Sequence, residues 1–177
     1  TFNIDYRKIE NKITNKTKAI LVVSLYGQIP DIDEINKIAE KHNLPVIEDG
    51  AQSFGALYNG KRSGSLTTIG TTSFFPSKPL GCYGDGGACF TNDDHIALKI
   101  RAIKSHGGVK RFEHKYIGLN ARLDTIQAAI LNVKLNYFDL TIKKRNECAK
   151  YYSENLKILE DLNYIKLPSI SENKTSV

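Results

Sequence analysis

The hydrophobic pattern changes twice early in the chain, and this change constrains the fold more than any other feature. Residues 19–25, AILVVSL, form a short apolar run that is typical of a strand buried on both faces. An amphipathic pattern follows, which predicts a helix over residues 31–42 with Asp31 as its N-cap. A second apolar run, residues 44–47, leads to Asp49. Strand, helix and strand in this order predict a β–α–β unit with a right-handed crossover, and therefore a parallel sheet.

The rest of the chain continues this α/β pattern. A glycine-rich loop over residues 49–64 contains a short hairpin at Asn59-Gly60, and strands are predicted at residues 69–75 and 88–91. Three further helices carry apolar residues at helical spacing: Ile96, Ile100 and Ile103 after a cap at Asn92 or Asp93, then Ile126, Ile130, Val133 and Tyr137 after a cap at Asp124, then Ala149, Tyr152 and Leu156. Residues 167–177 are loop-like, so we expect one mostly parallel sheet flanked by helices.

The composition excludes several classes of protein. The 177 residues carry a formal net charge of +6, but the basic residues are interleaved with acidic ones, which disfavours a nucleic-acid-binding stripe. No apolar run approaches the roughly 20 residues of a membrane span, and the first residues lack the pattern of a secretory signal. Three cysteines at no metal-ligand spacing favour free thiols in a reducing compartment. We therefore expect a cytoplasmic protein with no metal site, no nucleic-acid partner and no membrane partner.

Residues 55–61, GALYNGK, match part of the phosphate-loop motif. That loop needs Ser or Thr at the next position to ligate Mg²⁺, and it must open a helix. Arg62 occupies the next position, and the glycine at position 64 disfavours a helix. The segment is therefore predicted to be a turn.

Asp49 and Gln52 lie on one short turn after a predicted strand. Open α/β sheets bind their ligands at the carboxyl ends of strands, so this carboxylate and this carboxamide are placed to converge on a ligand. The alternative is that Asp49 only caps the loop.

Ser73 and Lys78 follow the strand predicted at residues 69–75. Lys78 stands between two prolines, with Phe75 and Leu80 beside it. An apolar turn disfavours the charged ammonium, and a neutral lysine amine attacks carbonyl carbons. The alternative is a surface lysine whose stem packs while its ammonium reaches water.

Asn120 and Arg122 precede the helix predicted after Asp124. They offer an amide and a bidentate guanidinium to an anion. The alternative is that Arg122 pairs with Asp124 at the start of the helix.

Over most of residues 2–160 these segments resemble the DegT/DnrJ/EryC1/StrS family of PLP-dependent sugar aminotransferases. The matching runs are SLYGQ at 24–28, VIEDGAQSFGA at 46–56, TSFFPSKPLGCYGDGGA at 72–88 and GLNARLDTIQAAIL at 118–131. The resemblance implies the large domain of a fold-type I aminotransferase. It assigns residues 1–140 to the PLP-binding large domain, and residues 141–177 to a helix and the start of a C-terminal small domain. Because family members are about twice this length, we expect residues 1–177 alone to bind the cofactor poorly and to transaminate little.

The resemblance also implies roles for single residues. Lys78 aligns with the lysine that binds pyridoxal phosphate covalently, and Asp49 with the acid that pairs with the pyridinium nitrogen. Gln52 falls at a glutamine packed near the ring hydroxyl, and Ser73 at a hydroxyl that binds the phosphate.

Two further residues are implied to serve a composite site in a homodimer. Asn120 matches an asparagine that reaches the phosphate from the neighbouring subunit. Arg122 lies beside it, where this branch of the family engages substrate.

The run at residues 73–88 is most similar to the branch that acts on UDP-linked 2-acetamido-3-keto sugars, especially the 3-oxo-glucuronate aminotransferases of bacterial surface-polysaccharide (O-antigen) synthesis. The resemblance implies a UDP-linked keto sugar and L-glutamate as substrates. The alternatives are a 4-keto sugar aminotransferase and a non-catalytic regulator or sensor on the same fold. A sugar dehydratase is disfavoured, because that chemistry replaces the lysine at position 78 with histidine.

Overall fold

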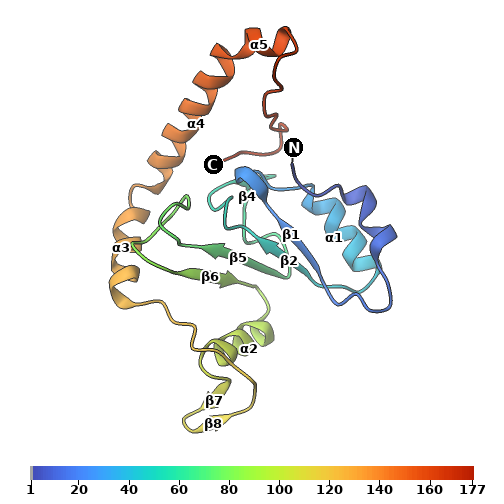
Figure 1. The fold of residues 1–177 in the computed structure, drawn as a ribbon. Helices are drawn as coiled ribbons and strands as arrows, with labels where there is room; N and C mark the ends of the chain where they lie inside the picture. Colours follow the sequence, from blue (N-terminus) through green and yellow to red (C-terminus); the bar gives the residue numbers. More distant parts are fainter. Residues whose placement is uncertain (1) are drawn as a thin grey trace.

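The computed structural model describes residues 2–177 and is built around a four-stranded sheet (Figure 1). The strands are β1 (Ile20–Val23), β2 (Val46–Asp49), β5 (Ile69–Ser73) and β6 (Gly87–Phe90), in the order β1-β2-β5-β6. The first three are parallel, and β6 is antiparallel to β5. The predicted α/β class with a mostly parallel sheet is therefore confirmed.

Helix α1 (Ile32–Lys41) covers one face of β1 and β2, as the predicted β–α–β unit requires. Its buried side chains pack with those of the two strands in one cluster that includes Ile32, Ile35, Ala39, Ile20, Val22 and Val46. Three short 3-10 helices precede it: η1 (Tyr6–Lys8), η2 (Glu10–Lys12) and η3 (Leu25–Gly27).

Asp31 stands at the N-cap position of α1, but its predicted capping role is wrong. Its side chain makes no capping hydrogen bond. Instead, Asp31 Oδ1 accepts a hydrogen bond from Lys174 Nζ at 2.7 Å. A cation 143 positions away in the sequence competes for this carboxylate, and local pattern does not reveal such a partner.

The predicted burial of the first strand on both faces is also wrong. Val22 is 1% exposed beneath α1, whereas Leu21, on the opposite face of β1, is 60% exposed. Successive side chains of a strand point to opposite faces, and residues 2–177 bury only one face at this position. The strand is also shorter than the apolar run that predicted it.

A two-stranded hairpin follows β2, and it confirms that residues 55–61 form a turn and not a phosphate loop. Its strands are β3 (Leu57–Tyr58) and β4 (Lys61–Arg62). Asn59 and Gly60 connect them with φ of +48° and +76°. This left-handed backbone is the conformation that a two-residue hairpin turn requires.

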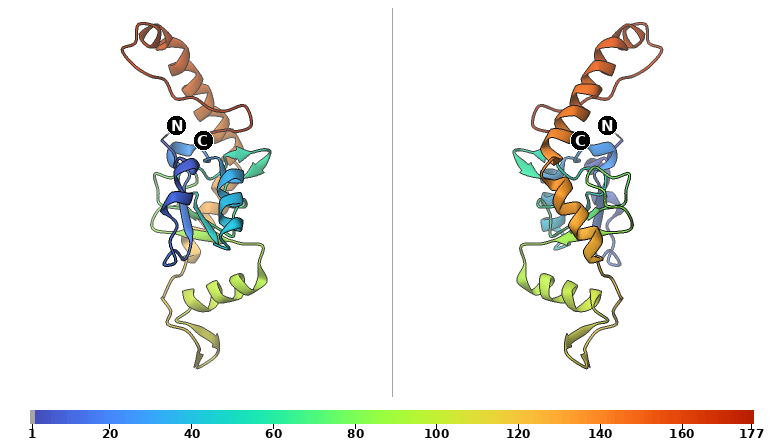
Figure 2. Two further views of the ribbon diagram at one scale, coloured as in Figure 1. Left: turned by 90° about the vertical axis from the view of Figure 1, so that its right-hand side faces the viewer. Right: turned by 90° about the vertical axis from the view of Figure 1, so that its left-hand side faces the viewer.

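The chain projects from the sheet in two opposite directions (Figures 1 and 2). At one end are α2 (Asp94–Lys104), β7 (Gly108–Lys110) and β8 (Glu113–His114). At the other end are α4 (Phe138–Asn155) and α5 (Lys157–Asp161). The predicted cap of α2 is confirmed, because Asp93 Oδ1 accepts a hydrogen bond from the Ile96 N–H at 3.0 Å.

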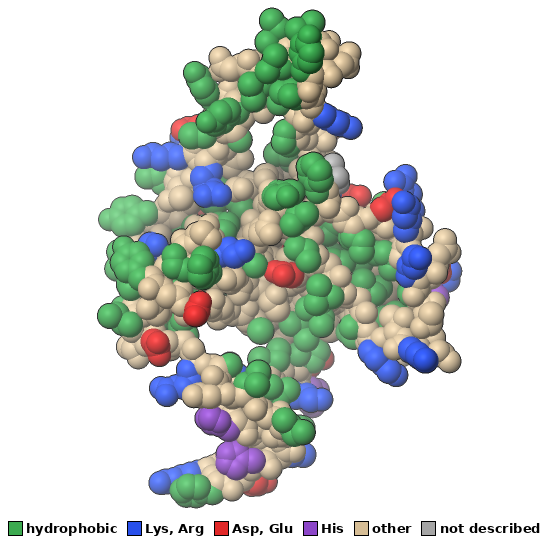
Figure 3. All heavy atoms as spheres, viewed as in Figure 1, with side chains coloured by type: hydrophobic (Ala, Val, Ile, Leu, Met, Phe, Trp, Pro, Cys, Tyr) green, Lys and Arg blue, Asp and Glu red, His purple; other side chains and the backbone are tan. Residues whose placement is uncertain are grey.

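Helix α3 (Thr125–Leu135) connects these two projections, and it turns a different face to the sheet than its apolar stripe predicted. Ile126, Val133 and Tyr137 are 68%, 61% and 63% exposed. Figure 3 shows hydrophobic side chains on the surface where α3 lies. Leu131 is the buried residue of the helix. The reason is that α3 packs through its other side onto the loop between β5 and β6.

Residues 167–177 return to the hairpin as an extended segment, and Lys174 forms a bridge with Tyr58. The Thr175 N–H donates to the Leu57 carbonyl at 2.9 Å, and the Asn59 N–H donates to the Asn173 carbonyl at 2.8 Å. Helix α4 runs unbroken through residues 140 and 141, where the domain boundary was placed. The division into two domains stays a prediction.

Candidate active site

Asp49 and Ser73 lie at the carboxyl edge of the sheet, as the last residues of β2 and β5. Asp49 is level with Thr71 in the parallel register. Because side chains alternate along a strand, Asp49, Thr71 and Ser73 share one face of the sheet. The structure therefore brings the predicted carboxylate and the predicted hydroxyl to the same edge and the same face.

The Asp49 carboxylate is held from one side only. Its Oδ1 accepts a hydrogen bond from the Ala51 N–H at 3.0 Å, which orients the side chain over the following turn. Among residues 2–177, Oδ2 has no hydrogen-bond donor. One carboxylate oxygen thus remains able to bind a positively charged or N–H-bearing ligand.

Gln52 lies on the same turn and is fixed by the backbone after β1. Its Oε1 accepts a hydrogen bond from the Tyr26 N–H at 2.8 Å. Tyr26 has a φ of +53°, so the chain turns sharply where it presents this N–H. A backbone amide donates only, so the Gln52 oxygen faces Tyr26 and the Gln52 NH₂ group remains a donor for another acceptor.

Lys78 lies in the loop that follows β5, and its side chain is half-buried. The Lys78 N–H donates to the Phe75 carbonyl at 2.9 Å, and Ser73 Oγ accepts from the Phe75 N–H at 3.2 Å. Leu80 is 3% exposed, whereas Phe75 is 49% exposed. The apolar turn predicted around Lys78 is therefore closed on the Leu80 side and open on the Phe75 side.

The lysine loop, residues 74–86, is anchored at its base and along α3. The Cys82 N–H and the Cys82 thiol both donate to the Phe74 carbonyl, at 2.8 and 3.0 Å. From α3, Lys134 Nζ donates to the Gly81 carbonyl at 2.5 Å, and Gln127 Oε1 accepts from the Tyr83 N–H at 2.8 Å. Sequence reasoning missed these anchors, because they come from a helix about 50 residues further along the chain.

Asn120 and Arg122 do not join Asp49 and Lys78 in this chain. Asn120 pairs with Ser105 in a backbone bridge after α2, and both predicted residues are exposed. Arg122 lines a cavity of about 1130 Å³ together with Phe90 and residues of α2. Residues of both sheet faces line this cavity, including Thr71 and Phe90, so it wraps around the β5–β6 side of the sheet.

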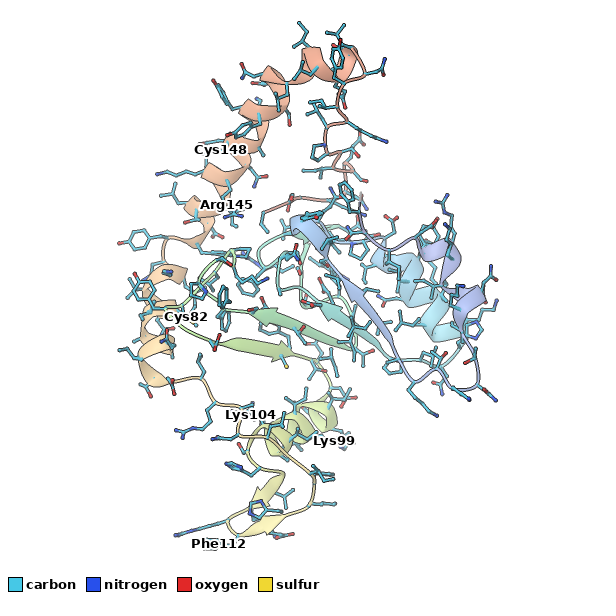
Figure 4. The ribbon with its side chains drawn as sticks, viewed as in Figure 1. Cys82, Lys99, Lys104, Phe112, Arg145 and Cys148 are labelled. Carbon is cyan, nitrogen blue, oxygen red and sulfur yellow. The ribbon has the colours of Figure 1, made fainter. Side chains whose placement is uncertain are left out.

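Figure 4 labels one residue of the lysine loop and one residue of α2, the helix next to Asn120. Cys82 belongs to the lysine loop, while Lys104 is the residue whose carbonyl accepts from the Ala121 N–H at 2.9 Å. In this view Cys82 lies beside α3, whereas Lys104 lies on α2 at the other side of β6. Among residues 2–177, no hydrogen bond joins the side chain of Asn120 or Arg122 to Asp49 or Lys78.

A buried acidic network behind the site was also missed. Glu48 is fully buried and accepts hydrogen bonds from Ser24 Oγ at 3.0 Å and from Ser63 Oγ at 2.6 Å. Ser63 Oγ in turn lies 2.7 Å from Ser53 Oγ. The signal in the sequence was an acid inside an apolar strand, since a buried carboxylate needs partners.

Comparison with known proteins identifies the family of this chain. The model of the DegT/DnrJ/EryC1/StrS aminotransferase family matches residues 1–177. The chain belongs to this family. The family is PLP-dependent, and the match confirms the fold and the family that the sequence motifs implied.

Two relatives and one solved structure illustrate the match. The UDP-2-acetamido-2-deoxy-3-oxo-D-glucuronate aminotransferase of Pseudomonas aeruginosa is 55% identical over all of this chain and 48% of its own. The pleiotropic regulatory protein of Geobacillus stearothermophilus is 50% identical over 89% of this chain and 42% of its own. The crystal structure of NtdA from Bacillus subtilis, with bound cofactor PMP, matches with a TM-score of 0.89 at 39% identity over 98% of this chain and 40% of its own.

The chain thus spans just under half the length of the proteins it matches. Within residues 2–177, none of the helices is both long and apolar enough to cross a membrane.

Proposed function

We propose that the full-length protein is a PLP-dependent transaminase that places an amino group on the keto carbon of a nucleotide-linked sugar. The observation that carries this proposal is the meeting of Asp49 and Ser73 on one face of the sheet edge, with Lys78 in the loop that leaves the same edge. This edge is where open α/β sheets bind their ligands.

The residues present fit the cofactor by the chemistry of their donors and acceptors. The free oxygen of Asp49 suits the protonated ring nitrogen, and the NH₂ group of Gln52 suits the ring oxygen. The Ser73 hydroxyl suits the phosphate, and the Lys78 amine suits the aldehyde. When bound, pyridoxal phosphate supplies an electron sink for the carbon atom that carries the amino group.

The chain's own residues then perform the proton chemistry. Asp49 keeps the proton on the ring nitrogen, because an ionised carboxylate next to it favours the charged ring. Lys78 Nζ would act first as a base, removing the proton from the donor carbon that carries the amino group. It would then act as an acid, delivering a proton to the carbon atom of the former aldehyde. Asp49 ends β2 and Lys78 lies in the loop that follows the adjacent strand β5, so the sheet and the anchors of this loop together set their relative position.

We propose a UDP-linked 2-acetamido-3-keto sugar or uronate as the acceptor and L-glutamate as the donor. The support is the 55% identity to the P. aeruginosa aminotransferase, whose name specifies such a uronate. We also propose a homodimer in which Asn120 and Arg122 serve the partner's site, since neither side chain has a hydrogen bond to Asp49 or Lys78 among residues 2–177. Such an enzyme makes an amino sugar for bacterial surface polysaccharide.

A regulator or sensor is a second candidate function, favoured by the 50% identity to the pleiotropic regulatory protein. Covalent capture of the cofactor separates the candidates. The full-length protein is incubated with pyridoxal phosphate, reduced with borohydride, digested and analysed by mass spectrometry. Transamination predicts a pyridoxyl label on Lys78 that is lost in Lys78→Ala, and an unlabelled Lys78 contradicts it.

The reaction itself is tested with a panel of substrates. The full-length enzyme receives glutamate and either UDP-linked 3-keto or 4-keto sugars, and the products are identified by mass spectrometry. We expect amination of the 3-keto compounds. A labelled Lys78 without any aminated product favours the sensor, and product from 4-keto sugars alone favours the 4-keto branch.

A further inference from the structure

We propose that Glu48 is a positioning residue that fixes the turn bearing Asp49 and Gln52. This inference rests on the proposed function, because it concerns the two side chains assigned there to the ring of the cofactor. The Glu48 side chain lies on the sheet face opposite to that of Asp49, since adjacent residues of a strand face opposite ways. Its influence must pass through the backbone of residues 49–53.

The Glu48 carboxylate is fully buried, and both of its oxygens are paired. Oε1 accepts from Ser24 Oγ at 3.0 Å and from Ser63 Oγ at 2.6 Å. Oε2 accepts from the Gly64 N–H at 2.8 Å. Three donors and no competing acceptor make this a site for a carboxylate, and an amide in its place would turn an NH₂ group toward a donor.

The proton order along the chain of serines follows from these contacts. The Ser63 hydrogen is used toward Glu48, so the Ser53 hydroxyl must donate to Ser63 Oγ across their 2.7 Å contact. Ser53 and Ser24 are fully buried, and Ser63 is 6% exposed. The network therefore runs through direct contacts between buried groups from Glu48 to Ser53, at the far end of the turn.

Gly70 makes this arrangement possible. It is level with Glu48 in the parallel register, on the same face of the sheet. A Cβ atom on Gly70 would lie only 2.0 Å from the Gly64 carbonyl oxygen. The missing side chain lets the loop of Ser63 and Gly64 lie directly on β5, which brings both donors to Glu48.

The turn from Asp49 to Ser53 is thus clamped at both ends. Before Asp49, the Glu48 side chain is bound to Ser24, and the Ser24 N–H also donates to the Asp49 carbonyl at 3.0 Å. At the other end, Ser53 is bound to the network and its N–H donates to the Gly50 carbonyl at 3.0 Å. Loss of the Glu48 charge is expected to loosen both ends together.

The test compares variants of the full-length protein: Glu48→Gln, Ser63→Ala and the control Glu40→Gln, an exposed glutamate of α1. Two quantities are measured, the Kd of pyridoxal phosphate by equilibrium dialysis and the pH midpoint of the visible absorption of the bound cofactor. We expect Glu48→Gln to weaken binding roughly tenfold and to shift the midpoint, and Ser63→Ala to do the same more weakly. Glu40→Gln should leave both unchanged.

Coupling to Asp49 distinguishes positioning from general loss of structure. In an Asp49→Asn background, Glu48→Gln should weaken binding much less than in the wild type, because the group that it positions is already altered. Equal effects in both backgrounds, or a lower melting temperature with unchanged Kd and midpoint, would overturn the proposal. If Glu48→Gln does not fold, Ser63→Ala decides the question by the same measurements, since it leaves the bonds from Ser24 and Gly64 in place.

The two proposals fail in different ways. A wild-type protein that takes no borohydride label on Lys78 removes the proposed function, and the role of Glu48 with it. A labelled wild type whose variants bind the cofactor normally removes the role of Glu48 alone.

Discussion

Gln52 Oε1 accepts a hydrogen bond from the backbone N–H of Tyr26 at 2.8 Å, and this contact decides what the rest of the side chain can do. The oxygen is occupied by a residue 26 positions earlier, so the NH₂ group is the part left for a ligand. The Gln52 oxygen therefore has a structural role, and the NH₂ group is the part of the side chain that can bind a ligand.

Substitutions at position 52 should separate the contribution of the Gln52 oxygen to stability from the contribution of its NH₂ group to cofactor binding. Gln52→Glu keeps an acceptor for Tyr26 and removes the donor, whereas Gln52→Leu removes both. We expect Gln52→Glu to preserve the melting temperature while weakening pyridoxal phosphate binding at least fivefold, and Gln52→Leu also to cost about 1–2 kcal/mol of stability. Thermal unfolding and equilibrium dialysis measure the two effects. Normal cofactor binding by Gln52→Glu would contradict a role for the NH₂ group.

Arg122 offers a guanidinium to a substrate carboxylate in the proposed dimer. Arg122→Ala should therefore lower kcat/KM for a UDP-linked 3-keto uronate by roughly a hundredfold and for the neutral hexose counterpart by less than fivefold. Steady-state kinetics on the full-length enzyme check this. Equal losses of kcat/KM on both substrates would show that Arg122 does not bind the substrate carboxylate.

Gly70 should be the least tolerant glycine of the sheet. Its added Cβ would meet backbone atoms of Gly64 at 2.0–2.5 Å, so Gly70→Ala is expected to destabilise the protein by about 3 kcal/mol or more. Gly60→Ala is the matched control, because nothing lies within 4 Å of its Cβ and only its φ of +76° opposes the change, at about 1 kcal/mol. Urea unfolding compares the two, and similar losses would argue against the close approach of the loop to β5.

Glu10 gives the fold a pH-dependent contact. Hydrogen bonds from Lys41 and then from His42 hold the pKa of the Glu10 carboxyl below its ordinary value of 4.5. A lowered acid pKa contributes stability that is present above the ordinary value and is lost as the pH falls through the lowered one.

Glu10→Gln should therefore be less stable than the wild type at pH 7, and the difference should shrink as the pH falls below about 4.5. Melting temperatures between pH 3 and pH 7 at low salt measure it. A difference that stays constant over this range would exclude the ion pair as its cause.

The elements of the fold were largely predictable from the sequence. Helix α1, the strands β1, β2, β5 and β6 and the turn at Gly60 all lie where hydrophobic period and turn residues placed them. The predicted site divides in two: Asp49 and Ser73 share an edge because β2 and β5 are parallel neighbours, whereas Arg122 lines a cavity with Phe90 and residues of α2. The wrong predictions, which concern Asp31, the second face of β1 and the apolar stripe of α3, share a cause. Each depends on which distant residues a side chain contacts in the folded chain.

Local residue order alone determined the α/β class, the bounds of most elements and the motifs that reveal the family, because helix and strand periods depend on neighbours a few positions apart. Tertiary structure decided the rest. Asp31 binds Lys174 instead of capping its own helix, and the apolar stripe of α3 is exposed. Ser24 and Ser63 both donate hydrogen bonds to Glu48, the residue before Asp49. These contacts join residues 15 to 143 positions apart, and only the packing of the folded chain selects such partners.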